Sequence, residues 1–322
     1  MTLVRKYAYL LPVALAASLI TPLQAQQEGP APTQTLVGVD AKSPVIPSVS
    51  NTTLKLNNHP EPLISLTRVS PSSAQVALLI DDGLRTSVGR ELGALRSFVT
   101  TLPAGTEIFV GYMQNGRVVP AQGFTSDLAT AAQSLRIPQG SPGISASPYF
   151  CLSDFVKKWP GEEGDSNSNL SAGPVHKARF VLMITDGVDP YNGSTSLLNQ
   201  NSPYVSAAVS DAQTKGIPVY SIYFSDAGIR GGRASFSGQS YLQQVADGTG
   251  GRAYYIGTGN PVSLAPFLTQ FQHAVAETYV ATFNAPASKN LVRVKFETKL
   301  SNTKLRTPED VRPGTHIVGT GQ

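Results

Sequence analysis

Residues 74–83 read AQVALLIDDG, an apolar run that stops at the carboxylates of Asp81 and Asp82. A second segment, residues 178–187, repeats this pattern as ARFVLMITDG and ends at Asp186. Short apolar runs bounded by turn residues are typical of buried strands, and open α/β sheets bind ligands at the carboxyl ends of their strands. We therefore expect two buried strands that bring Asp81 and Asp186 to one edge of a sheet.

The rest of the central region alternates between helical and strand patterns. Apolar spacing predicts helices over 87–102, 126–135, 148–159, 204–215, 241–247 and 262–278, and strands over 106–113, 117–124, 217–224 and 252–256. Asn115 and Gly116 predict a hairpin turn, and the glycine-rich stretch 227–238 is expected to be a loop. This order predicts an α/β fold: a doubly wound, mostly parallel sheet with helices on both faces.

The two ends of the chain carry weaker patterns. Residues 51–69 predict an edge hairpin that leads into the sheet, so that one domain spans 51–285. Residues 279–283 and 291–298 alternate cleanly and predict a small C-terminal β-hairpin. Residues 286–322 are then a β-strand extension and tail.

The first 25 residues have the pattern of a secretory signal peptide, with Arg5 and Lys6 before an apolar run and a small residue, Ala25, at the cleavage site. Residues 26–50 are rich in Pro, Gln and Ser and are expected to be a disordered spacer. The apolar run is too short for a membrane span, and no later stretch is a candidate. The sequence therefore predicts a protein that is exported to the periplasm or secreted, with no transmembrane segment in the mature chain.

Charge and cysteine content argue against a nucleic-acid-binding protein and against a disulfide-stabilised one. The formal net charge is +4, and removing Arg5 and Lys6 leaves 23 basic and 21 acidic residues, or +2. This balance is too mild to indicate binding to nucleic acid. Cys151 is the only cysteine, so no intrachain disulfide can form, and we expect it to be a small buried hydrophobic residue.

Five segments in this order resemble a von Willebrand factor type A (VWA) domain, and in particular its degenerate bacterial branch known from Acidobacteria. They are residues 78–82, 122–127, 182–187, 249–255 and 279–283. The resemblance covers about 53–318. It implies a metal-ion-dependent adhesion site for Mg²⁺ or Ca²⁺, built from an Asp-x-Ser-x-Ser loop, a Thr from a second loop and an Asp from a third.

The match to that metal site is incomplete. Asp81 and Asp186 match its two acids, but Gly83 and Arg85 stand at the serine positions, and reading from Asp82 restores only Thr86. The resemblance therefore implies a vestigial site in which Arg85 or water replaces the cation. One alternative is a weak Mg²⁺ or Ca²⁺ site made by Asp81, Asp82, Asp186 and either Thr86 or Ser87; another is that these carboxylates only cap helices and turns.

These inferences favour an exported, non-enzymatic module that binds an unidentified protein partner. The contact surface would be four loops at the carboxyl edge, 81–87, 140–147, 188–202 and 227–238. Two alternatives stay open. One is a metal-dependent hydrolase that uses Asp81, Asp82 and Asp186, and the other is a purely structural envelope protein.

Overall fold

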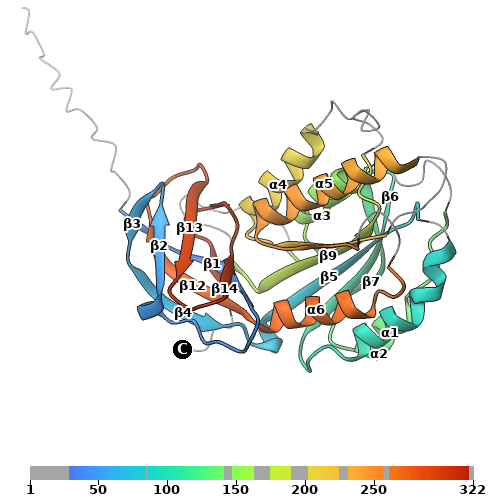
Figure 1. The fold of residues 1–322 in the computed structure, drawn as a ribbon, viewed down its shortest axis with the longest axis horizontal. Coiled ribbons are helices and arrows are strands. Elements are labelled where there is room, and N and C mark those ends of the chain that lie inside the picture. Colours follow the sequence, from blue (N-terminus) through green and yellow to red (C-terminus); the bar gives the residue numbers. More distant parts are fainter. Residues whose placement is uncertain are drawn as a thin grey trace, which may run out of the picture.

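The computed structural model describes residues 29–84, 86–140, 147–162, 175–189, 202–224, 231–256 and 261–318. It consists of an α/β unit that lies beside a β-sandwich (Figure 1). The predicted signal peptide at 1–25 lies outside the described residues and stays a prediction. None of the helices within the described part of the chain is both long enough and apolar enough to cross a bilayer.

The α/β unit is built on a six-stranded sheet with the order β11-β10-β9-β5-β6-β7. Neighbouring strands are parallel except β7, which returns antiparallel to β6 through the turn at Asn115 and Gly116. The strands are β5 (Ala74–Asp81), β6 (Glu107–Gln114), β7 (Arg117–Thr125), β9 (Ala178–Thr185), β10 (Val219–Tyr223) and β11 (Ala253–Tyr254). This mixed sheet agrees with the α/β prediction, but it is only one of four sheets in the described chain.

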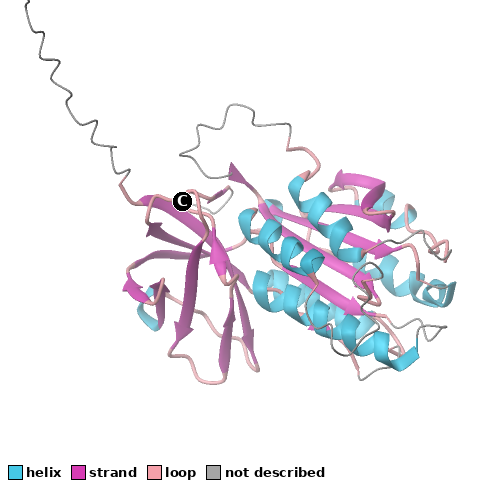
Figure 2. Cartoon of the chain, turned by 90° about the horizontal axis from the view of Figure 1, so that it is seen from above, coloured by secondary structure: helices cyan, strands magenta, loops and turns pink. Residues whose placement is uncertain are grey.

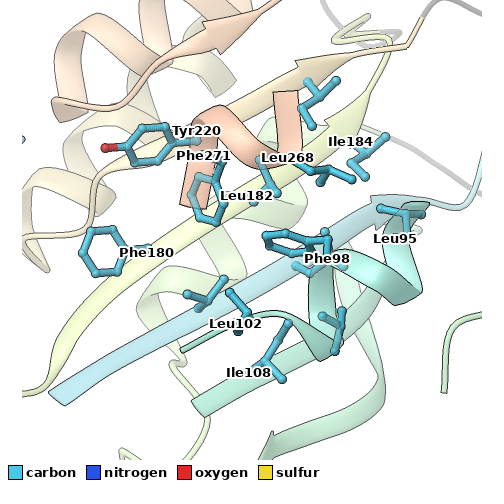
Figure 3. Close-up of a cluster of buried hydrophobic side chains, with 14 of the residues drawn as sticks. Leu95, Phe98, Leu102, Ile108, Phe180, Leu182, Ile184, Tyr220, Leu268 and Phe271 are labelled. Atoms are coloured by element: carbon cyan, nitrogen blue, oxygen red, sulfur yellow. The ribbon is translucent and has the colours of Figure 1, made fainter. Parts of the chain in front are cut away.

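Helices cover both faces of this sheet because consecutive residues of each strand point to opposite sides. In β5, Leu78 and Ile80 face one side, while Ala77 and Leu79 face the other. Three helices pack on the first side: α1 (Leu92–Thr100), α2 (Leu128–Gln133) and α6 (Ala265–Ala276). Figure 3 shows side chains of α1 and α6 in this layer. The other three helices pack on the second side: α3 (Pro148–Lys157), α4 (Pro203–Thr214) and α5 (Gly231–Thr249). Short 3-10 turns lie at η1 (Val49–Asn51), η2 (Pro71–Ser73) and η3 (Thr86–Glu91).

The β-sandwich is made of two antiparallel four-stranded sheets, the strand-rich part of the molecule in Figure 2. One sheet has the order β14-β1-β12-β4 and the other β15-β13-β2-β3. The strands are β1 (Ala31–Ala41), β2 (Thr52–Leu56), β3 (His59–Glu61), β4 (Leu63–Arg68), β12 (Thr278–Ala285), β13 (Val292–Thr298), β14 (Thr303–Arg306) and β15 (Asp310–Val311). Val37, Leu54, Phe283 and Phe296 are among the side chains that fill the space between the sheets.

The sandwich corrects three predictions about the chain ends. Residues 31–41 are not a spacer, because β1 is a long strand that pairs with both β12 and β14. The predicted C-terminal hairpin does not form, because β12 and β13 belong to different sheets. The predicted edge hairpin is also split: β2 pairs with β3, whereas β4 joins the opposite sheet. Alternation identifies strands, but it does not identify their partners.

The glycine-rich stretch 227–238 was predicted to be a loop, but its described part, from Gly231 onward, is the first half of α5. Packing explains the glycine composition at one of these positions. A Cβ atom on Gly238 would lie 2.2 Å from the carbonyl oxygen of Asp186. Only glycine lets α5 approach the end of β9 this closely, so close packing overrides the low helix propensity of this stretch.

The sandwich contacts the α/β unit at the amino ends of the parallel strands. Arg252, which immediately precedes β11, donates to Asp40 of β1 at 3.2 Å. A two-stranded pair of β8 (Val175–His176) and β16 (His316–Ile317) ties the C-terminal segment to the start of β9. The carboxyl edge of the sheet, where Asp81 lies, is therefore the end away from the sandwich.

Candidate functional site

Asp81 and Thr185, the last residues of β5 and β9, are in contact at the carboxyl edge of the sheet. The Thr185 hydroxyl donates to Asp81 Oδ2 at 2.7 Å, and the backbone N–H of Gly83 donates to Asp81 Oδ1 at 2.9 Å. The Thr185 hydroxyl oxygen in turn accepts from the N–H of Gly187 at 3.1 Å. These bonds join the two loops that follow β5 and β9, as the two similar sequence segments predicted.

Asp186 follows Thr185 and shapes the turn after β9. Its Oδ1 accepts from the N–H of Val188 at 2.9 Å, and Gly187 has a positive φ of 66°. The hydroxyl of the buried Tyr149 donates to the Gly187 carbonyl at 2.7 Å. Burial raises the pKa of Tyr149 well above its usual value, and the charges of Asp186 and other nearby carboxylates raise it further. The loop after β9 is therefore held against α3 by a neutral tyrosine.

The carboxylate of Asp82 accepts four hydrogen bonds from the protein. Its side chain is fully buried, and Arg136 donates from Nη1 to Oδ1 at 2.7 Å and from Nη2 to Oδ2 at 3.0 Å. The N–H of Gln139 also donates to Oδ1 at 3.0 Å, and the amide of Gln114 donates to Oδ2. Burial raises the pKa of Asp82, but these hydrogen bonds outweigh it and hold the pKa below the usual value.

Arg136 is itself fixed in place by Tyr112 of β6. Its guanidinium carbon lies 3.7 Å from the centre of the Tyr112 ring, and the Tyr112 hydroxyl donates to the backbone carbonyl of Arg136 at 2.7 Å. The hydrogen bond to Asp82 raises the pKa of Arg136. No local pattern indicates this pair, because Arg136 lies 54 residues from Asp82 and the fold of β6, β7 and α2 brings the two together.

The structure leaves part of the predicted site untested. Arg85 and the side chain of Thr86 lie outside the described residues, so the role predicted for Arg85 stays a prediction. Ser87 is described and lies half-buried in η3. Most of the predicted contact loops 140–147 and 188–202, and residues 227–230, also lie outside the described part.

A third buried carboxylate, Asp189, lies in the predicted contact loop 188–202 but was not among the predicted metal ligands. The hydroxyl of Ser202 donates to Asp189 Oδ2 at 2.6 Å, and both side chains are buried. Ser202 also caps the start of α4, where Pro203 occupies the first turn. This contact joins the segment that follows β9 to the start of α4, a role that neither residue's local sequence indicates.

Protein donors engage the carboxylates of Asp81 and Asp82, two of the predicted cation ligands. Mg²⁺ and Ca²⁺ need several oxygen ligands with lone pairs directed at one point. Both oxygens of Asp82 accept from protein donors, and so do both oxygens of Asp81. Within the described ranges, no three His, Cys, Asp or Glu side chains lie close enough to hold a metal. The assignment of Asp81, Asp82, Thr86, Ser87 and Asp186 as metal ligands stays a prediction, and the described structure adds that Arg136 pairs with Asp82.

Two other features of the edge concern its reactivity and its surface. Cys151 is buried, as predicted, and burial raises the pKa of its thiol to about 12, so it is not a nucleophile at neutral pH. Phe150 is 49% exposed and lies over Gly116 in the β6–β7 turn, with its ring 6.1 Å from that of Tyr204. Ile137, next to Arg136, is 46% exposed. Apolar surface therefore flanks the buried carboxylates.

No family model matches the sequence, and no curated protein matches it. Solved structures with partial similarity include an aerotolerance-related membrane protein from Bacteroides fragilis, at 12% identity and a TM-score of 0.41, with 63% of this chain and 98% of that chain covered. The pilus adhesin SpaC from Lactobacillus rhamnosus GG has 9% identity, a TM-score of 0.40 and coverages of 84% and 47%. The SpRpn10 VWA domain has 8% identity and a TM-score of 0.38, with 62% of this chain and 94% of that chain covered. These similarities are too distant to assign a family or a function.

Proposed function

We propose that this chain is an exported, non-enzymatic protein-binding module of the VWA type, and that the carboxyl edge of its central sheet contacts a protein partner without a bound metal ion. The observation that carries the proposal is the pairing of Asp82 with Arg136. A buried carboxylate needs a compensating positive charge. A guanidinium supplies that charge to Asp82 here, so this buried carboxylate is neutralised without a bound cation.

The surface beside this pair supports a protein partner. Phe150 and Ile137 are exposed, and Arg136 retains 38% of its side-chain exposure. Aromatic residues and arginine are enriched in protein interfaces and at their energetic centres. A partner that buried Phe150 would gain apolar contact area, and an acidic group on the partner could approach the outer face of Arg136.

The hydrolase alternative has less support from this geometry. It requires Asp81, Asp82 or Asp186 to be available to a substrate, a metal or a water molecule. Asp82 is committed to Arg136, and Asp81 is 4% exposed with both oxygens accepting hydrogen bonds. The purely structural alternative predicts that alanine substitutions at the carboxyl edge leave every phenotype intact.

The first test is a thermal melt of residues 26–322 with EDTA and then with Mg²⁺, Ca²⁺ or Mn²⁺ at millimolar concentration. A ligand that binds only the native state raises its stability by mass action. We expect the melting temperature to change by less than about 1 °C with each cation, because Arg136 already neutralises Asp82 and both oxygens of Asp81 accept hydrogen bonds. A cation-dependent rise that is lost in both Asp81→Ala and Asp186→Ala would show a functional metal site and overturn the proposal.

The second test locates the partner surface. A photo-crosslinking residue is placed at Phe150, and a matched one at Val49, which is 43% exposed on the sandwich. Both proteins are exposed to envelope extract of the source cell in EDTA. The proposal requires a specific product from position 150 alone, and Phe150→Ala must weaken binding of the identified partner by about tenfold or more. Equal products at both positions would contradict it.

A further inference from the structure

A cavity of 390 Å³ lies where the β-sandwich meets the α/β unit, at the end of the molecule away from Asp81. One wall is the end of β1 and the segment that follows it, including Gly38, Asp40 and Lys42. The opposite wall comes from α6, and the floor from Tyr220 of β10 and Tyr254 of β11. Its volume is within the range of small-molecule sites, which are common at domain interfaces.

The charges that line the cavity leave an excess of positive charge. Arg252 and Arg306 both donate to one carboxylate oxygen, Asp40 Oδ2, at 3.2 and 3.1 Å. Lys42 adds a third cation. The other acid of the lining, Glu277, is paired with Arg68, which is not a lining residue. Three cations therefore face one carboxylate, which favours occupation by an anion.

Arg252 is the cation best placed to meet a ligand. Its side chain is 40% exposed, compared with 17% for Arg306. Only its Nη1 donates to Asp40, so in this structure the guanidinium retains further N–H groups that could donate to a ligand. The guanidinium also lies 5.6 Å from the centre of the Tyr254 ring, which restricts its orientation.

Tyr220 supplies a neutral donor in the same cavity. Its ring is buried between Phe271 and Tyr254, at centroid distances of 5.0 and 6.5 Å. Figure 3 shows its hydroxyl on the side of the ring that points away from Leu268 and Ile184. No hydrogen bond to a described residue satisfies this hydroxyl, and it lies 3.7 Å from where a Cβ on Gly38 would be. Burial raises the pKa of Tyr220 to about 12, so the hydroxyl keeps its proton at neutral pH.

We propose that this cavity binds a small organic carboxylate, with its oxygens accepting from Arg252 and from the Tyr220 hydroxyl, and with its apolar body against Val45 and Ala274. The aliphatic lining selects against fully hydrated inorganic anions, and the guanidinium selects against neutral analogues. Gly38 is part of the site because the absence of a side chain there keeps the space above Tyr220 open. The inference is independent of the proposed function, since the cavity lies at the opposite end of the strands.

Calorimetric titration of residues 26–322 tests this with hexanoate and benzoate as probes, at fixed ionic strength. Hexanamide and benzamide are the neutral isosteres, and inorganic phosphate is the small hydrated anion. We expect at least one carboxylate to bind about tenfold or more tightly than its amide and than phosphate, which is the ratio that one charge-assisted hydrogen bond supplies. The proposal would be overturned if a carboxylate and its amide bound with equal affinity, or if phosphate bound as tightly as the carboxylates. It would also be overturned if no carboxylate bound at 10-fold molar excess over about 1 mM protein.

Three variants and one control localise the binding. Arg252→Gln is expected to weaken it about tenfold and Tyr220→Phe several-fold, whereas Arg117→Gln, an exposed arginine on the edge strand at the far side of the sheet, should leave it within about twofold. Gly38→Val should abolish binding by filling the space, while β-branched valine suits a strand. If Arg252→Gln does not fold, Gly38→Val and Tyr220→Phe still test whether the carboxylate binds in this cavity. Unchanged affinity in either of these two would show that the probe binds elsewhere.

Discussion

A single buried carboxylate, Asp82, links three elements of the carboxyl edge. Its neighbour in sequence, Asp81, is bonded to β9, whereas Asp82 is bonded to Arg136 after α2 and to Gln114 at the end of β6. The two adjacent acids therefore serve different parts of the site. The sequence predicted that both would be found at this edge, but the distinction between them depends on Arg136, whose position follows only from the tertiary fold.

Replacing Arg136 with glutamine should lower the free energy of unfolding by about 3 kcal/mol at pH 7, because Asp82 would stay buried without a charged partner. The folded-state pKa of Asp82 is lowered, so its contribution is present above the unfolded value of about 3.9 and is lost as the pH falls through the lower folded pKa. The deficit of Arg136→Gln should accordingly shrink in acid. Urea unfolding at several pH values measures it.

The control for that experiment is Arg117→Gln, which removes an exposed arginine of the same sheet and should change the stability by less than about 0.5 kcal/mol. If both variants had the same small effect, Asp82 would not depend on Arg136, and the argument for a guanidinium in place of a cation would fail.

His176 provides a second test at the residue scale. It is 4% exposed, and burial, together with the charge of Arg179, lowers its pKa from 6.5 to about 4. The unfolded chain therefore binds a proton near pH 6.5 while the folded protein does not, so stability should fall as the pH falls from about 6.5 to 4. The full effect is about 3 kcal/mol, from 1.4 kcal/mol per pKa unit. The variant His176→Asn should lack this part of the pH dependence; an unchanged slope would contradict the assignment.

At the scale of elements, the end of α5 and the start of β11 are fixed by two glycines. Gly250 has a positive φ of 82°, which ends the helix, and a Cβ on Gly251 would lie 1.9 Å from the carbonyl oxygen of Val219. This close approach lets β11 pair with β10 at Ser221 and Ile222. The short edge strand β11 can therefore form because Gly251, in the turn before it, has no side chain.

Gly251→Ala should therefore destabilise the protein by about 3 kcal/mol or more, or prevent folding, because β11 would have to move away from β10. Gly93→Ala is the matched control. Gly93 lies in α1 with open space around it, so alanine there should stabilise the helix by about 0.5–1 kcal/mol. Soluble yield and thermal melting of the two variants give the comparison, and a neutral Gly251→Ala would disprove the packing argument.

Most elements of the α/β unit were predictable because their periodicity and their burial agree. The strand over 178–185 is buried at every position, and the helix predicted over 204–215 forms as Pro203–Thr214. The first half of α5 was not predictable, because its glycines indicate a loop, and the close approach to Asp186 that explains Gly238 is a tertiary contact. Pairing partners were likewise not predictable, since β1 and β12 find each other across 248 residues at Gln34 and Thr282.

At the scale of the whole molecule, residues 31–41 decide whether the chain has one folded unit or two. Val37 of β1 is fully buried between the two sheets of the sandwich. Val37→Asp should therefore destabilise the sandwich by about 4 kcal/mol or more, since it buries an unpaired charge. Ser43→Asp, at an exposed position just after β1, should be nearly neutral. Equal melting temperatures for the two variants would restore the interpretation of this segment as a spacer.

The β-sandwich, which takes strands from both ends of the chain, also sets an order of events in time. The α/β unit can form from contacts within 69–277, whereas β1 and β4 must wait for β12. A chain that emerges amino terminus first therefore presents β1, β4 and the β2–β3 hairpin with unpaired edges until residues 278–322 arrive, a state prone to aggregation. Pulse-labelling hydrogen exchange should show the amides of β5 and β9 protected before those of β1 and β12, and chains stopped after residue 277 should aggregate.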